Sequence, residues 1–333
     1  MSNSPIQHEH DIDAVIAWVD GKDPLFVKKL TEALKYLNYE GSSEEYSADR
    51  FVSHYDIYTC VLSIRRFAPF IRNIHIITDQ QDPGINKYLE KFDRSWSKRI
   101  KLVDHKDIFS HYLQYLPVFN SLSIETMLYN IPDLAEHFIY FNDDFFLTRD
   151  VEPQDFFVGG LPKIRGYVSS HNSIAAKYDI SKALNSNTIG FVMPMVTASK
   201  VSYPNYNRFI RLFHTPYAMR KSILSQFAEN NPNIIESNIQ YKLRSTNQFN
   251  TASLAGLVEY LEHNNKPVRE PANIYLKPLN RFPGYCRIKL LPYYINADIK
   301  FGCIQSLASA SNECRDFLWK WLQKNIIGFK LDI

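Results

Sequence analysis

The sequence of 333 residues has only four cysteines, at positions 60, 286, 303 and 314, and none of them forms a C-x-x-C pair. This argues against a disulfide framework or a cysteine zinc site and predicts a reduced, cytoplasmic setting. The amino terminus, MSNSPIQHEHDID, lacks the apolar core of a signal peptide. No run of roughly 18 apolar residues follows, so we expect no spanning helix, whereas peripheral membrane association stays open.

An excess of charge of one sign is also missing. The 38 lysines and arginines are balanced by 35 acidic residues, which leaves a net charge of +3. Nucleic-acid-binding proteins carry a marked basic excess, so we expect no nucleic acid partner. Apolar residues make up 45% and charged residues 22%, the composition of a folded globular chain. Aromatic residues are plentiful at 14%, and such rings either hold sugars or simply fill the core.

Apolar strands and amphipathic helices alternate over the first 150 residues. Helices are predicted near 27–37, 57–68, 85–92 and 121–129, and the strands between them are Ile12–Val19, Ile74–Thr78, Ile100–Val103 and Phe138–Phe141. This alternation predicts an α/β fold, with a mostly parallel, Rossmann-like sheet and helices on both faces.

The second half of the sequence has a different character. Loops and small strands are expected up to about residue 210, an extended segment over 287–295, and helices near 217–229, 234–243, 251–263 and 313–326. We therefore divide the chain into an α/β core with the expected ligand site, residues 1–150, and a mixed part, residues 151–333, that completes the site with a helical lid.

An acidic residue follows each predicted strand, at Asp20, Asp79, Asp104 and the pair Asp143-Asp144. Because ligands of such sheets bind at the carboxyl ends of the strands, this pattern predicts a rim of carboxylates at the ligand site. Aspartate after a strand is also a common turn residue or helix N-cap, and this structural interpretation applies most readily to Asp104.

The segment FIYFNDDFFL, residues 138–147, carries the strongest local signal. Two adjacent carboxylates at the end of a buried strand repel each other, and a divalent cation relieves that repulsion. Mg²⁺ binds one or two carboxylates and keeps its other positions for water and phosphates. Asp143 and Asp144 are therefore the predicted ligands of Mg²⁺ or Mn²⁺.

Three further motifs have both a functional and a structural interpretation. In AWVDGKDP, the turn at Gly21 can present backbone N–H groups to a phosphate, and Asp20 and Asp23 either contact the ligand or cap a helix. His214, in LFHTPY, is either a general base or a half-buried histidine. Arg244, in YKLRSTNQ, is either a surface charge or a clamp on a diphosphate.

Four blocks of the sequence together resemble the Stealth family, whose members transfer a sugar 1-phosphate from a nucleotide sugar. The first is IDAVIAWVDGKDP, and the second runs from RFVSHYDIYTCVLSIRRFAPF through LPVFNSLSIE to HFIYFNDDFFL. The third is HTPYAMRKSI with the arginine of YKLRS, and the fourth, weaker block is DIKFGCIQSLASASNE. The resemblance covers most of the chain. It implies a GT-A-like sheet and a core, residues 1–150, that binds nucleotide sugar and metal.

One stretch departs from the family pattern. An Arg-Asp-Asn-x-Glu-like stretch is replaced by Val52–Asp56, so the family's contacts there are in doubt. Arg50 and Asp56 keep part of the pattern, and His54 is a candidate substitute for the missing residues.

The resemblance also implies a role for each matching residue. Asp143 and Asp144, with Asn142, match the acidic motif at the metal and diphosphate, and Asp144 is placed among the catalytic residues. Asp20 and Gly21 match the first block near the nucleotide. The residues that match at the transferred phosphate are His214 and Arg244, and those that line the donor pocket are Asn120, Ser121 and Glu125.

From the resemblance we expect a sugar-1-phosphate transferase of capsular or cell-surface polysaccharide synthesis. The expected donor is a UDP-hexose or UDP-N-acetylhexosamine, and the acceptor is a glycan, expected to be lipid-linked at the inner membrane face. Two alternatives stay open at this point. An ordinary glycosyltransferase would use the same donor and release UDP instead of UMP, and a glycan-binding subunit would catalyse nothing.

Overall fold

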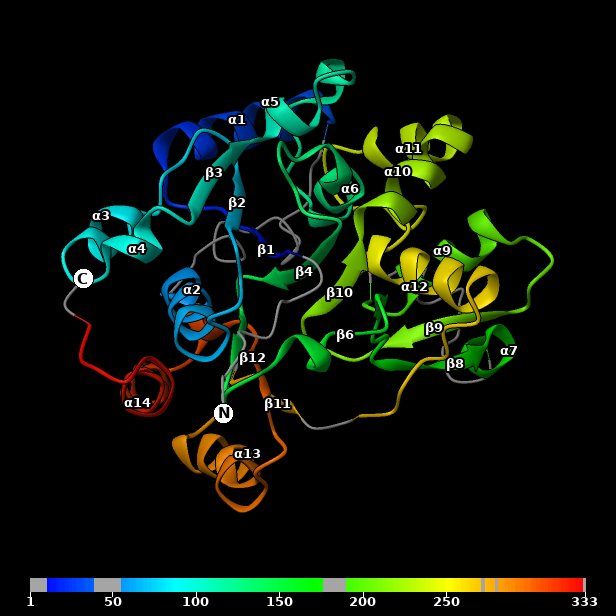
Figure 1. Ribbon diagram of the computed structural model, residues 1–333. Helices are drawn as coiled ribbons and strands as arrows, with labels where there is room; N and C mark the ends of the chain where they lie inside the picture. The colour runs from blue at the N-terminus through cyan, green and yellow to red at the C-terminus, as the bar shows by residue number, and fades with distance from the viewer. Residues whose placement is uncertain (1–10, 39–54, 176–189, 271–272, 279–280, 332–333) are drawn as a thin grey trace, which may run out of the picture.

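The computed structural model describes residues 11–38, 55–175, 190–270, 273–278 and 281–331 (Figure 1). A five-stranded sheet in the order β10-β4-β1-β2-β3 forms its centre. These strands are β1 Ile12–Ala17, β2 Ile74–Thr78, β3 Ile100–Asp104, β4 His137–Asn142 and β10 Tyr217–Arg220. The first four are parallel and β10 runs antiparallel to β4, so the prediction of a mostly parallel α/β sheet is confirmed.

Helices connect the parallel strands, as predicted. They are α1 Pro24–Tyr36, α2 Asp56–Phe67, α3 Ile85–Glu90, α4 Arg94–Ser97, α5 His105–Ile108 and α6 Ser121–Thr126. In α1, proline occupies the first turn and Phe26, Leu30 and Ala33 are buried, at the spacing that an amphipathic helix requires. Short 3-10 turns occur at Leu113–Tyr115, Leu128–Asn130, Pro153–Asp155 and Leu307–Ser309.

Smaller sheets extend the central one. A three-stranded sheet, in the order β11-β12-β5, joins β5 Phe145–Leu147 to β11 Asn273–Leu276 and β12 Phe301–Ile304. Two hairpin-like pairs are formed by β6 Phe157–Val158 with β7 Leu161–Pro162, and by β8 Gly166–Ser170 with β9 Arg208–Leu212. The three-stranded sheet matters for function because β5 begins directly after Asp144.

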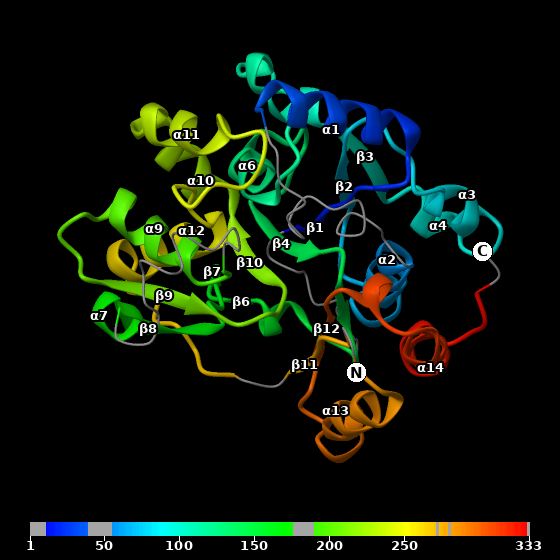
Figure 2. The same ribbon diagram turned by 180° about the vertical axis from the view of Figure 1, so that it is seen from behind.

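Helices of the second half are α7 His171–Ala175, α9 Met193–Ser202, α10 Lys221–Asn230, α11 Pro232–Ile239, α12 Thr251–Glu262, α13 Pro283–Ile295 and α14 Asn312–Leu322, which continues into one π-helical turn, Gln323–Ile327. Figure 1 and Figure 2 show α9 to α12 beyond β10 and α2 and α14 on the other side. The expectation that helices of the second half close over a bound ligand as a lid stays a prediction.

Three sequence predictions of local structure are wrong. Helix α9 forms where only loops and small strands were expected, because its buried residues are nearly consecutive and show no helical period. Residues 217–220 form β10 rather than the start of a helix, because Tyr217–Met219 is a short apolar run that pairs with β4. The segment 287–295 is part of helix α13 rather than extended. Apolar residues at almost every position and Pro292 within the segment hide its helical period.

Both halves contribute to one hydrophobic core, a cluster of buried side chains that extends from Ile12 to Leu331. The four cysteines are all buried and unpaired. Among the helices of the described residues, none is long and apolar enough to cross a membrane.

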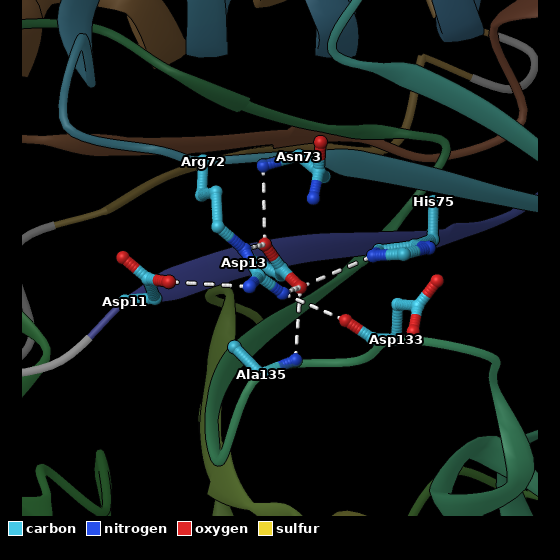
Figure 3. Close-up of polar contacts among 7 residues, drawn as sticks. All are labelled: Asp11, Asp13, Arg72, Asn73, His75, Asp133 and Ala135. Carbon is cyan, nitrogen blue, oxygen red and sulfur yellow. Dashed lines mark hydrogen bonds and ion pairs between the residues drawn. The ribbon is translucent and has the colours of Figure 1, made fainter.

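An ionic cluster lies at the edge of the sheet where β1 and β2 begin (Figure 3). The carboxylate of Asp13 is fully buried and accepts hydrogen bonds from Arg72, from His75 and from the backbone N–H groups of Asn73 and Ala135. These bonds outweigh the effect of burial and lower the pKa of Asp13 to about 2. The cluster therefore has a structural task, because ligand sites of such sheets lie at the opposite edge.

Candidate active site

Two carboxylates stand at the turn between β4 and β5. Asn142 ends β4 in register with Ala17 at the end of β1, so Asp143 and Asp20 lie at the same edge of the sheet. Burial, aided by the charge of Asp144, raises the pKa of Asp143 to about 7, and burial raises the pKa of Asp144 to about 6. An ionised pair at this position is unfavourable unless a positive charge joins it.

The oxygens of Asp144 fit a divalent cation. Oδ1 is buried and has no hydrogen-bond partner among the described residues, while Oδ2 accepts a weak bond from Cys303 Sγ at 3.5 Å. No group of three or more histidine, cysteine or acidic side chains forms a metal cage in the described ranges. Mg²⁺ suits such a site, because water and phosphate oxygens complete its coordination.

A small hollow opens beside this pair. Its polar lining comes from Asp143, Asp144, Asp56 and Thr59, and its apolar lining includes Phe146 and Ile304. Asp56 is the first residue of α2, so the N-terminal end of that helix brings a third carboxylate to the hollow. Of the stretch that departs from the family pattern, Asp56 is thus placed at the site, whereas Arg50 and His54 lie outside the described residues.

Arg244 is held against the first residue of α6. Its Nη2 donates to Ser121 Oγ at 3.0 Å, and its positive charge acts on the buried Glu125. Burial raises the pKa of Glu125 to about 7, although Arg244 opposes that rise. Tyr140 of β4 donates its hydroxyl to Glu125 Oε1 at 3.3 Å. The structure thus joins three of the predicted residues, Ser121, Glu125 and Arg244, to the strand that ends at the acidic pair.

Asn120 has a structural task in this protein, and the donor contact that the resemblance implies stays a prediction. Its Oδ1 caps α6 by accepting from Ser123 N at 2.9 Å, and its Nδ2 donates to Tyr241 O at 2.7 Å. Gln248 donates to the same Oδ1 at 3.2 Å. These bonds use both ends of a buried amide, so Asn120 holds the segment that carries Arg244 against α6.

The first motif forms a turn after β1. Asp23 N donates to Asp20 O across Gly21, and Gln81 bonds both the N–H and the carbonyl of Asp20. The Asp20 carboxylate accepts from Lys22 N at 2.9 Å. Asp23 caps α1 by accepting from Phe26 N, so its structural interpretation is confirmed.

Two of the other acidic strand ends are structural. Asp79 pairs with Lys29 Nζ at 2.8 Å. Asp104 caps α5 in a reciprocal capping box with Asp107, which confirms the structural interpretation of Asp104. The expected rim of carboxylates is therefore narrower than the sequence suggested and centres on Asp143 and Asp144.

His214 packs between two aromatic rings, Phe191 at 3.9 Å and Tyr275 at 4.9 Å between ring centroids. Burial lowers the pKa of His214 to about 4, so its imidazole is neutral at pH 7 and carries a free lone pair. Tyr275 pairs in register with Cys303, the residue that touches Asp144. His214 is thus linked to Asp144 through Tyr275 and Cys303.

Tyr217 is a site residue that the sequence analysis missed. Its hydroxyl is buried without a hydrogen-bond partner among the residues described. Burial raises its pKa well above the usual value, and the charges of Glu125 and Asp144 add to the rise, so both carboxylates lie within electrostatic range of the hydroxyl. Its position three residues after His214 could have indicated a site residue, but the sequence analysis interpreted this segment as the start of a helix.

The chain is similar to a known protein family and to several curated proteins. Residues 50–164 match the family model described as Stealth protein CR2, conserved region 2. The capsular polysaccharide phosphotransferase of Actinobacillus suis is 34% identical over 74% of this chain and 63% of its own length. That of Neisseria meningitidis serogroup B is 33% identical over 78% and 67%, and that of Haemophilus influenzae is 31% identical over 94% and 81%.

The chain thus spans somewhat less than two thirds of the A. suis relative. Among solved structures, the galactosyltransferase LgtC in complex with donor and acceptor sugar analogs is similar with a TM-score of 0.43 and 9% identity, over 96% of this chain and 97% of that one. The sequence relatives, the matched conserved region and the acidic strand end lead to one conclusion: the chain belongs to the Stealth family.

Proposed function

We propose that this chain transfers a hexose 1-phosphate or N-acetylhexosamine 1-phosphate from a UDP-sugar to a hydroxyl group of a glycan, in the synthesis of a bacterial capsular or cell-surface polysaccharide. The observation that carries the proposal is the buried, unpartnered Oδ1 of Asp144 beside Asp143 at the carboxyl edge of the sheet. The names of the curated relatives support it.

In this proposal an oxygen of the acceptor bonds to the β-phosphorus of the donor. The bond between that phosphorus and the bridging oxygen breaks, and UMP leaves. The product is a phosphodiester between sugar and glycan. Such transfers depend mainly on positioning and on neutralisation of phosphate charge.

Each group at the site has a part in this step. Asp143 and Asp144 hold Mg²⁺ or Mn²⁺, which when bound neutralises diphosphate charge. Arg244, positioned by Ser121, directs its positive charge to the phosphoryl oxygens. His214, neutral at pH 7, accepts the proton of the acceptor hydroxyl. The turn at Asp20 and Gly21 faces the nucleotide.

The identity of the nucleotide product tests the proposal. The chain is incubated with a panel of UDP-sugars, Mg²⁺ and a lipid-linked oligosaccharide, and the released nucleotide is identified by mass. UMP is expected. UDP would instead mean breakage at C1 of the sugar, as in an ordinary glycosyltransferase, and glycan binding without any product would mean a binding subunit.

Arg244→Lys should lower kcat by about 100-fold, because lysine keeps the charge but loses the planar fork that grips phosphate oxygens. KM for the donor should change less than kcat if the clamp acts mainly in the transition state. Steady-state kinetics measure both constants. Arg94→Lys, at an exposed position in α4, is the matched control and should leave both unchanged. Equal kinetics for the two variants would remove Arg244 from the site.

His214→Gln should lower kcat by about 100-fold or more, because glutamine cannot take up the acceptor's proton. Binding of the donor should be nearly unaffected, since the proton leaves the acceptor and not the nucleotide. The test compares turnover with donor affinity measured calorimetrically. His263→Gln, at the exposed end of α12, is the matched control. Full turnover in His214→Gln would assign the base to another residue.

A further inference from the structure

Helix α13 is the outermost element at one end of the molecule, and it appears at the lower edge in both Figure 1 and Figure 2. One face of it is anchored to the protein. Cys286 and Leu290 are buried, and the Tyr293 ring packs edge-on against Trp321 with centroids 5.1 Å apart. Trp321 Nε1 also donates to the hydroxyl of Tyr294 at 2.8 Å. The helix is therefore fixed in its rotation about its own axis.

The face that points away from the protein is apolar as well. Ile288, Leu291 and Ile295 are 63%, 53% and 81% exposed. Their spacing of three, four and seven residues places them on one stripe, roughly opposite to Cys286 and Leu290 at about 100° per residue. Phe282, which immediately precedes the helix, is 67% exposed. Single exposed apolar residues are ordinary, but an aligned stripe of them marks an interaction surface.

Cations flank this stripe. From residue 271 to residue 297 the chain contains no acidic residue and four basic ones, Lys277, Arg281, Arg287 and Lys289. Arg287 lies over the Phe317 ring and Lys289 lies near the Tyr285 ring, at 5.4 Å and 5.9 Å from the ring centroids. An apolar stripe between positive charges complements the surface of an anionic bilayer.

A second copy of the chain fits this face less well. Two such helices placed stripe against stripe would bring Arg287 and Lys289 towards the same cations of the other copy. The segment offers no carboxylate to pair with them. Charge complementarity therefore favours a lipid surface over self-association.

We propose that α13 lies in the plane of an anionic membrane surface, with Phe282, Ile288, Leu291 and Ile295 inserted at the boundary of headgroups and acyl chains. This inference goes beyond the proposed reaction and does not depend on it. It assigns a membrane-facing side to the molecule. β11 leads towards α13, and the neighbouring β12 carries Cys303, which touches Asp144, so that side is structurally continuous with the acidic pair.

Vesicle sedimentation of the full chain, without substrate, tests the proposal. We expect binding to vesicles of phosphatidylcholine mixed with phosphatidylglycerol, and at least tenfold weaker binding to phosphatidylcholine alone. Leu291→Glu should weaken binding to the anionic vesicles by at least tenfold, because a carboxylate replaces an inserted apolar group. Leu113→Glu is the matched control, since Leu113 is also 53% exposed but lies outside α13, and it should bind as the wild type does.

Thermal melting checks that both variants fold. Equal binding of wild type and Leu291→Glu, or no binding of the wild type to anionic vesicles, would overturn the proposal. A dimer of the wild type that Leu291→Glu dissociates in sedimentation equilibrium would also overturn it and assign the face to a second copy. Because no substrate is present, none of these outcomes depends on whether the proposed transfer reaction is correct.

Discussion

Asp144→Asn should lower sugar-phosphate transfer by about a thousandfold or more while the protein stays folded. The substitution keeps the shape of the side chain but removes the charge that would hold a cation at the unpartnered Oδ1. Removal of one charge-stabilising group from such a site typically costs a factor of about 10²–10³, and loss of the bound metal adds to that. Initial rates of nucleotide release, at saturating donor and Mg²⁺, measure the effect.

The stability of Asp144→Asn should not fall with its activity. Burial and repulsion make two ionised carboxylates costly at this turn, so an amide at position 144 should leave the melting temperature unchanged or raise it. Mg²⁺ should raise the melting temperature of the wild type and have little effect on Asp144→Asn, because only the wild type binds it well.

Asp104→Asn is the matched control for this experiment. It makes the same chemical change at another acidic strand end, but Asp104 caps α5 and asparagine caps helices equally well. Turnover and stability of this variant should therefore equal those of the wild type. A wild-type rate in Asp144→Asn, or an equal loss in Asp104→Asn, would contradict the assignment of the metal site.

Asp13→Ala should lower the free energy of unfolding by about 3–5 kcal/mol. This is the largest effect on stability that we expect from a single substitution in this protein. The variant removes the buried acceptor that Arg72, His75 and two backbone N–H groups share, and it leaves His75 without this partner inside the protein. Denaturant unfolding measures the change. Residual folded protein should keep its turnover, because the cluster lies at the edge of the sheet away from the acidic pair.

Asp11→Ala supplies the control, since Asp11 pairs with the same arginine at 3.1 Å but is 68% exposed. Exposed ion pairs contribute roughly 0–1 kcal/mol, so this variant should be nearly as stable as the wild type. Similar unfolding free energies for the two variants would contradict the account of the cluster.

The cluster around Asp13 should also make the stability of the fold depend on pH in acid. The pKa of Asp13 is about 2 in the folded chain and near 4 when unfolded. Its contribution, about 2 kcal/mol, is present above pH ~4 and is lost as the pH falls towards 2. In Asp13→Ala that part of the acid-induced loss of stability should be missing.

Strands of the α/β half could be predicted closely because each is a short apolar run bounded by polar residues. Ile74–Thr78 agrees residue for residue with β2. The same run-based reasoning treated Ile12–Val19 as uniformly apolar and so overlooked Asp13, whose partners come from distant parts of the chain. Burial of a charge depends on those partners, and a local pattern does not contain them.

The location of Asp143 and Asp144 at the ligand edge of the sheet could also be predicted from the local sequence. Its position after a strand fixes the edge of the sheet at which it lies, and parallel topology makes that edge the ligand side. The role of Asn120 was not predictable, because its partners Tyr241 and Gln248 lie more than a hundred residues away. Tyr217 was missed because its position depends on β10 joining the sheet in antiparallel orientation.

The most direct test of the proposed reaction follows the donor's β-phosphorus. A UDP-sugar labelled with radioactive phosphorus at that position is incubated with the full chain, Mg²⁺ and a glycan acceptor, and the label is located after separation of nucleotide from glycan. We predict that the label moves into the glycan and that unlabelled UMP is released. Recovery of the label in UDP, with sugar transferred to the glycan, would contradict phosphoryl transfer at the Asp143–Asp144 site.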